Sequence, residues 1–190
     1  MAKQAILMLG APGSGKGTQA KNLVENYGFV QVSTGEIFRE RVQQADELGT
    51  KISECMNAGV LVPDELTAQM LEEHIRSINA EKILFDGFPR NEVQVAVFEE
   101  LLKKLEIEDL TPIYLHVEES ELIRRLLSRA VIEGRADDNE ETITKRIQTY
   151  NSVTQPVVDH YAQSPKFIKV IGDDNPPETV WEDLKSKLPW

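Results

Sequence analysis

The stretch GAPGSGKGT, residues 10–18, nearly matches the phosphate-binding loop G-x-x-x-x-G-K-[ST]. Gly17 stands directly after Lys16, where the pattern has a hydroxyl residue, and Thr18 comes one place late. Glycines let successive backbone N–H groups converge on one anion, and the lysine adds a charge that can reach the outer phosphates of a nucleotide. The stretch predicts a phosphate site, but it leaves the reaction open.

Arginines form the second chemical feature, because six of the nine fall in or beside short patterned stretches. These six are Arg39, Arg90, Arg125, Arg129, Arg135 and Arg146. Arg125 and Arg129 are four residues apart, on one face of a predicted helix. A net charge of −11 argues against nucleic acid or an anionic membrane as the main partner. The arginines would therefore supply local positive charge for phosphate groups.

Asp86 ends the apolar run ILF, which can form a strand beside the one that precedes the loop. An acid in this position can organise Mg²⁺. The three histidines and Cys55 fall in helix or strand patterns away from these stretches, so we interpret them as structural or surface residues. An acceptor phosphate is already ionised near neutral pH and needs no general base. The residues therefore favour phosphoryl transfer between two phosphate-bearing molecules.

Short apolar, β-rich runs alternate with longer helical patterns, which predicts a parallel sheet covered by helices on both faces. The strands are expected at residues 5–9, 29–32, 82–85, 112–117 and 167–171, and the helices at 15–26, 35–43, 46–58, 65–78, 91–105, 121–129, 140–162 and 177–188. Asp138 followed by Glu141 resembles a capping box at the start of the helix over 140–162.

Two segments interrupt this alternation. Residues 33–62 carry consecutive helical patterns without a strand between them, and residues 130–138 form a short polar bridge between two helices. Inserts at these points would lie over the carboxyl ends of the strands, where ligands bind in α/β proteins. A length of 190 residues suits a single domain.

Composition predicts a cytoplasmic protein. No apolar run approaches the length of a membrane span, and no signal peptide precedes the first strand. The single Cys55 permits no internal disulfide, which fits a reducing compartment. We expect a monomer, because the sequence shows no exposed apolar stripe.

Five stretches resemble, in order and spacing, the motifs of the adenylate kinases within the nucleoside monophosphate kinases. They are GAPGSGKGTQ, STGEIFR, GVLVPDE, DGFPRNEVQ and GRADDNEETITKR. The resemblance covers nearly the whole chain and implies a three-layer α/β/α fold of the P-loop NTPase type, with a five-stranded parallel sheet. It implies reversible transfer of the γ-phosphoryl group of Mg-ATP to AMP, giving two ADP. Residues 33–62 would be the insert that binds the monophosphate, and residues 130–138 a short lid.

The resemblance also implies roles for individual residues. Lys16, Arg90, Arg125, Arg135 and Arg146 would be catalytic. ATP would be bound by Gly13, Ser14, Gly15, Lys16, Gly17, Thr18, Arg129 and Gly172. AMP would be bound by Thr34, Arg39, Leu61, Val62, Gly87, Arg90, Gln94, Arg135 and Arg146. Asp86 would hold Mg²⁺ through water, and zinc is not expected because residues 130–138 lack the cysteines of zinc-bearing lids.

Two alternatives differ in substrate or class. A UMP/CMP kinase would usually have a small residue in place of Thr34 and an asparagine in place of Gln94, so these two residues favour AMP. A P-loop switch or hydrolase that reads guanine would need an N-K-x-D stretch, which the sequence lacks. Glu36 departs from the family pattern, which commonly has aspartate there.

Overall fold

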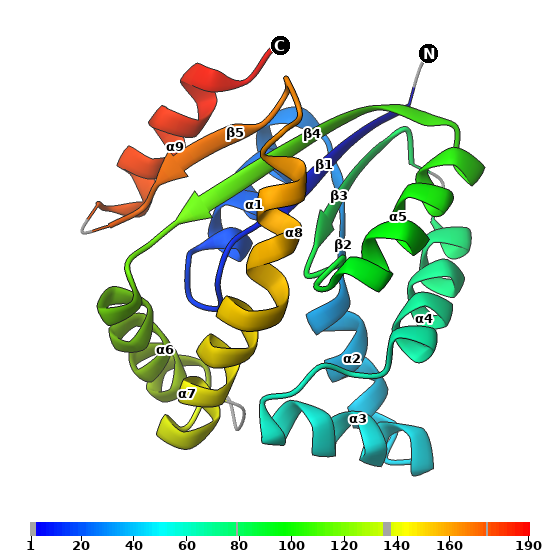
Figure 1. Ribbon diagram of the computed structural model, residues 1–190, viewed down its shortest axis with the longest axis vertical. Coiled ribbons are helices and arrows are strands. Elements are labelled where there is room, and N and C mark those ends of the chain that lie inside the picture. The colour runs from blue at the N-terminus through cyan, green and yellow to red at the C-terminus, as the bar shows by residue number, and fades with distance from the viewer. Residues whose placement is uncertain (1–2, 79, 135–137, 174) are drawn as a thin grey trace.

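The fold is a parallel sheet between two layers of helices, seen in a computed structural model whose described residues are 3–78, 80–134, 138–173 and 175–190 (Figure 1). The strands are β1 (Lys3–Leu9), β2 (Val30–Ser33), β3 (Lys82–Asp86), β4 (Ile107–His116) and β5 (Ile168–Ile171). All are parallel, in the order β2-β3-β1-β4-β5. The predicted five-stranded α/β fold is confirmed, and β1 and β3 are neighbours as expected.

The helices alternate with the strands, apart from the consecutive helices around the two interruptions. They are α1 (Lys16–Tyr27), α2 (Thr34–Gln43), α3 (Glu47–Ala58), α4 (Asp64–Ser77), α5 (Glu92–Lys104), α6 (Glu119–Glu133), α7 (Glu140–Thr149), α8 (Gln155–Tyr161) and α9 (Pro177–Lys187), with a π-helical turn, η1 (Tyr150–Thr154), between α7 and α8. No helix among the described residues is long and apolar enough to cross a membrane.

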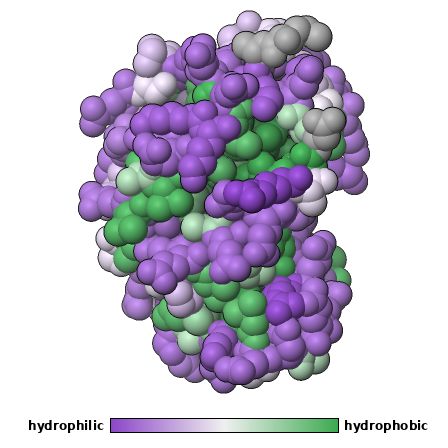
Figure 2. Space-filling model, turned by 90° about the vertical axis from the view of Figure 1, so that its right-hand side faces the viewer, coloured by the Kyte–Doolittle hydropathy of each residue, from purple (hydrophilic) through white to green (hydrophobic). Residues whose placement is uncertain are grey.

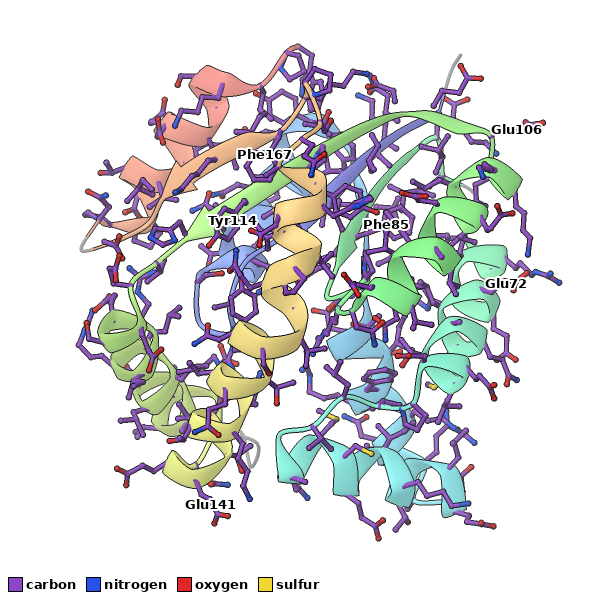
Figure 3. All side chains as sticks on the ribbon, in the orientation of Figure 1. Glu72, Phe85, Glu106, Tyr114, Glu141 and Phe167 are labelled. Atoms are coloured by element: carbon purple, nitrogen blue, oxygen red, sulfur yellow. The ribbon has the colours of Figure 1, made fainter. Side chains whose placement is uncertain are left out.

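Alternating side chains of the buried strands divide the core between the two faces of the sheet. On one face, residues such as Leu7 and Phe85 pack against α4, α5 and α8. Phe85 points towards α5, where its ring centroid lies 4.9 Å from that of Phe98 (Figure 3). On the other face, residues such as Ile6 and Leu84 pack against α1 and α9. Because both faces are covered, the central strands are almost entirely apolar.

Residues of α2, α3 and the loop before α4 have a small core of their own. Phe38, Ile52 and Val62 are buried together, with partly buried side chains around them. This separate core lets α2 and α3 hold their shape below the carboxyl ends of the strands (Figure 1). On the side formed by α3, α4 and α5, hydrophilic residues cover most of the surface and apolar residues form small patches (Figure 2).

Three local predictions are wrong. The helix expected over 140–162 is interrupted by η1, where the backbone takes one π-helical turn. α6 continues to Glu133, so the first residues of the expected 130–138 bridge are helical. Asn139, not Asp138, caps α7, because the Asn139 side chain accepts a hydrogen bond from the backbone N–H of Thr142.

Candidate active site

A cleft of about 1140 Å³ lies at the carboxyl ends of β1 and β3. The phosphate-binding loop forms its centre, α2 and the residues after α3 line one side, and α6 and α7 line the other. Its described basic side chains are Lys16, Lys21, Arg39, Arg90, Arg124, Arg125, Arg129 and Arg146. The chain therefore concentrates positive charge in one place, although its net charge is −11. Such a cleft suits a ligand with several phosphate groups.

The phosphate-binding loop joins β1 to α1, so the amino end of a helix faces the cleft. Gly13 has a positive φ of 84°, and a Cβ there would come within 2.9 Å of Leu126 on α6. A side chain at this position would separate the loop from α6. The loop therefore packs directly against the helix that carries Arg125 and Arg129.

Lys16 points back over the loop and donates hydrogen bonds from Nζ to the carbonyl oxygens of Gly10 (2.8 Å) and Ala11 (3.0 Å). Burial lowers the pKa of Lys16 to about 8, while Asp86 opposes this shift and nearby arginines add to it. A bound polyphosphate would favour the charged form. Lys16 therefore lies beside the cleft as an amine whose charge depends on what binds there.

Asp86 ends β3 and faces the cleft beside Lys16. Its Oδ2 lies 3.5 Å from Nε2 of Gln31, at the limit of a hydrogen bond. Mg²⁺ in nucleotide sites is usually bound by one or two carboxylates together with phosphate oxygens and waters. One half-buried carboxylate beside a phosphate-binding loop fits that donor set, so Asp86 is the residue that would hold the ion.

Gly87 connects two predicted site residues. Its carbonyl accepts hydrogen bonds from Oγ1 of Thr34 (2.9 Å) and from Nε of Arg90 (2.6 Å). A Cβ on Gly87 would come within 2.7 Å of both side chains, and its φ of 85° also favours glycine. Burial lowers the pKa of Arg90 while Asp86 raises it. Gly87 therefore positions the Arg90 guanidinium, and Thr34 lies behind the wall of the cleft.

Asp138 lies outside the cleft lining and holds two of its arginines, whereas the sequence predicted a helix cap. Its side chain is fully buried, and its carboxylate accepts two hydrogen bonds from Arg129 (2.6 and 2.8 Å) and one from Arg146 (2.6 Å). These arginines come from α6 and α7, so one carboxylate joins the two helices. The sequence signal for this role is an aspartate that follows an arginine-rich helix. The spacing of Asp138 and Glu141 indicated a helix cap instead.

We expect Asp138→Ala to lower the free energy of unfolding by about 2 kcal/mol, because two arginines lose a buried partner. Urea denaturation of both proteins measures this difference. Glu141→Ala is the matched control, since Glu141 is an exposed residue of α7 that pairs with Lys145 (Figure 3). Its free energy of unfolding should match that of the parent protein. Equal stability of Asp138→Ala and the parent would contradict the bridging role.

Glu121 positions Arg125, as Asp138 positions Arg129 and Arg146. Its carboxylate accepts hydrogen bonds from Arg124 and Arg125, which lower the pKa of Glu121 to about 2. Nη2 of Arg125 also donates to the carbonyl of Gly172 (2.6 Å). Arg125 is therefore fixed between α6 and the end of β5, and Gly172 contacts it through the backbone.

The other end of the cleft has an apolar wall. Leu61 and Val62 line it from the loop before α4, while the basic side chain of Arg39 lines the cleft from α2. Gln94 of α5 also lines this wall, although only 2% of the residue is exposed. An apolar wall with one buried amide suits the binding of a small aromatic group.

The structure places most predicted site residues in this cleft. They are Gly13, Ser14, Gly15, Lys16, Gly17, Thr18, Arg39, Leu61, Val62, Asp86, Gly87, Arg90, Gln94, Arg125, Arg129 and Arg146. Thr34 and Gly172 lie behind the wall and contact Gly87 and Arg125 respectively. Arg135 lies outside the described residues. The individual binding and catalytic roles stay predictions.

Comparison with known proteins identifies the family of the chain. The family model for adenylate kinase matches residues 8–166. An adenylate kinase from Thermus thermophilus is 41% identical over 185 residues, which are 97% of each chain. An adenylate kinase from Porphyromonas gingivalis is 42% identical over 168 residues (88% of this chain, 87% of the other). UMP-CMP kinase 3 from Oryza sativa subsp. japonica is 39% identical over 181 residues (95% and 83%). The chain therefore belongs to the adenylate kinase family of nucleoside monophosphate kinases.

Proposed function

We propose that the protein transfers the γ-phosphoryl group of Mg-ATP reversibly to AMP and so forms two ADP. The observation that carries the proposal is the single cleft that joins a phosphate-binding loop to an apolar wall with a buried amide. ATP would place its phosphates on the loop and its base beside Arg125 and Arg129. AMP would place its base against Val62 and Gln94. The triphosphate of ATP and the phosphate of AMP would then meet between Lys16 and Arg90.

The chemistry needs positioning and charge more than proton transfer. The attacking oxygen belongs to the AMP phosphate, which is largely ionised at neutral pH. Among the described residues that line the cleft there is no histidine, and its carboxylates include Asp86 and Glu121. Lys16, Arg90 and Arg146 would stabilise the charge that develops as the phosphoryl group moves. Mg²⁺, when bound, would neutralise phosphate oxygens and would be held near Asp86.

The UMP/CMP kinase type is the second candidate, because one relative of comparable similarity carries that name. Gln94 favours AMP. Its amide offers one donor and one acceptor to a base edge, and a buried amide that faces the wrong edge loses those hydrogen bonds. We also infer a monomer that acts in the cytoplasm, because the sequence shows no exposed apolar stripe and Cys55 is its single cysteine.

A bivalent inhibitor tests whether two nucleotide sites adjoin. Two adenosines joined through five phosphates should bind far more tightly than ADP, because the linkage removes the cost of the second association. Isothermal titration calorimetry measures both affinities. Binding no tighter than that of ADP would contradict two adjacent adenosine sites, whereas a matching compound with one uridine serves as the control for base preference.

A further inference from the structure

Asp64 connects the first turns of two helices that lie side by side, α4 and α5 (Figure 1). Its Oδ1 accepts a hydrogen bond from Nδ2 of Asn91 (2.8 Å) and another from Nε2 of Gln94 (2.7 Å). Asn91 is the N-cap of α5, and its Oδ1 accepts from the backbone N–H of Gln94 (2.8 Å). Three side chains therefore form one connected network behind the apolar wall of the cleft.

This network fixes which way the Gln94 amide faces. The backbone N–H of Arg90 donates to Oε1 of Gln94 (2.8 Å), so the oxygen must lie on the Arg90 side. An ionised carboxylate can only accept hydrogen bonds, so the nitrogen must lie on the Asp64 side. Turning the amide by 180° would place Oε1 against the carboxylate and Nε2 against an N–H donor. The Arg90 backbone N–H and the Asp64 carboxylate therefore favour the same orientation of the Gln94 amide.

One donor and one acceptor of Gln94 are left for a ligand. The amide oxygen has two lone pairs and the nitrogen two hydrogens, and the contacts with Arg90 and Asp64 use one of each. Because the orientation is held, the remaining donor and acceptor stand in a fixed order along the wall. A base edge with the opposite order would meet donor against donor and acceptor against acceptor.

Purines that differ at position 6 present these opposite orders. A 6-amino purine donates from its amino group and accepts at N1, whereas a 6-oxo purine accepts at O6 and donates from N1. A freely turning amide could pair with either edge, and a fixed amide pairs with one. We propose that Asp64 is a positioning residue that makes the acceptor site selective for 6-amino over 6-oxo purine monophosphates. This inference rests on the proposed function, in which the acceptor is AMP.

The test compares AMP with inosine monophosphate as acceptors for ATP in the whole chain of 190 residues. The two differ in the group at position 6 and the proton on N1, so the ratio of their kcat/KM values reports on the held amide. Asp64→Ala removes the two charge-assisted hydrogen bonds from Asn91 and Gln94. We expect the ratio to fall about tenfold, with a higher KM for AMP and an unchanged KM for ATP.

Two further variants make the result interpretable. Glu65→Ala removes an exposed acid from the same first turn of α4 and should keep the parent ratio. Asp64→Asn has nearly the same shape and keeps a neutral acceptor, so its ratio should fall less than that of Asp64→Ala. If Asp64→Ala does not fold, Asp64→Asn tests the inference instead, and we expect its ratio of kcat/KM values to fall severalfold.

The outcomes separate the inference from the proposed function. If folded Asp64→Ala and Asp64→Asn keep the parent's ratio of kcat/KM for AMP to kcat/KM for inosine monophosphate, the positioning role is overturned. AMP would still be the preferred acceptor, so the proposed function would stand. If kcat/KM falls equally for AMP, inosine monophosphate and ATP, Asp64 has a purely structural role. That result would also overturn the positioning role. Failure of the parent protein to phosphorylate AMP would instead contradict the proposed function.

Discussion

Lys16→Met is expected to lower kcat at least a hundredfold, which corresponds to about 3 kcal/mol of lost transition-state stabilisation. The Lys16 amine lies over the phosphate-binding loop and donates hydrogen bonds to two carbonyls of that loop. Methionine has a side chain of similar length without the charge. Steady-state kinetics with saturating ATP and AMP measure the effect. The melting temperature should change little, because the Lys16 side chain lines the cleft and is not part of the apolar core.

The matched control for this variant is Lys103→Met, which removes an exposed lysine of α5 outside the cleft. Its kcat should equal that of the parent. In the parent protein, the affinity for ATP should also fall as the pH rises through about 8, because free Lys16 loses its proton there. Lys16→Met should lack this fall. A kcat within threefold of the parent would contradict the role of Lys16.

Arg90→Ala is expected to lower kcat by two to three orders of magnitude, as does the loss of other preorganised charged donors. Gly87 holds the Arg90 guanidinium in the cleft, where the phosphates of ATP and AMP would meet. Removing the side chain also leaves the Gly87 carbonyl without this donor, so a modest loss of stability is expected. Kinetics and thermal unfolding on the same samples separate the two effects.

Arg76→Ala provides the comparison, because Arg76 is an exposed arginine of α4 that pairs with Glu72. It should match the parent in both measurements. A near-normal kcat in Arg90→Ala would contradict a catalytic role of Arg90. A loss that appears only in the KM for AMP would show binding without transition-state stabilisation.

Much of the fold could be predicted from the sequence because its signals are local. The loop at residues 10–18 combines a strand, glycines and the start of a helix, and each of these depends on neighbouring residues. The apolar strands are recognisable because both faces of the sheet are covered. The arginine stretches were visible for the same reason, since each arginine lies in a short pattern.

The contacts that position these residues could not be predicted, because they join distant segments. Asp138 binds arginines of two helices, and a local pattern made it look like a helix cap. Asp64 lies 30 residues before Gln94 and meets it only once α4 packs beside α5. The π-helical turn η1 places Oγ1 of Thr154 2.9 Å from the Arg90 carbonyl, a contact that helical periodicity alone does not indicate.

The most direct test of the account offers AMP, CMP, UMP and GMP as acceptors for Mg-ATP and quantifies every nucleotide product. We predict that AMP has the highest kcat/KM, that two ADP form for each AMP consumed, and that little inorganic phosphate is released. A higher kcat/KM with CMP or UMP, or ATP hydrolysis independent of any acceptor, would contradict the account.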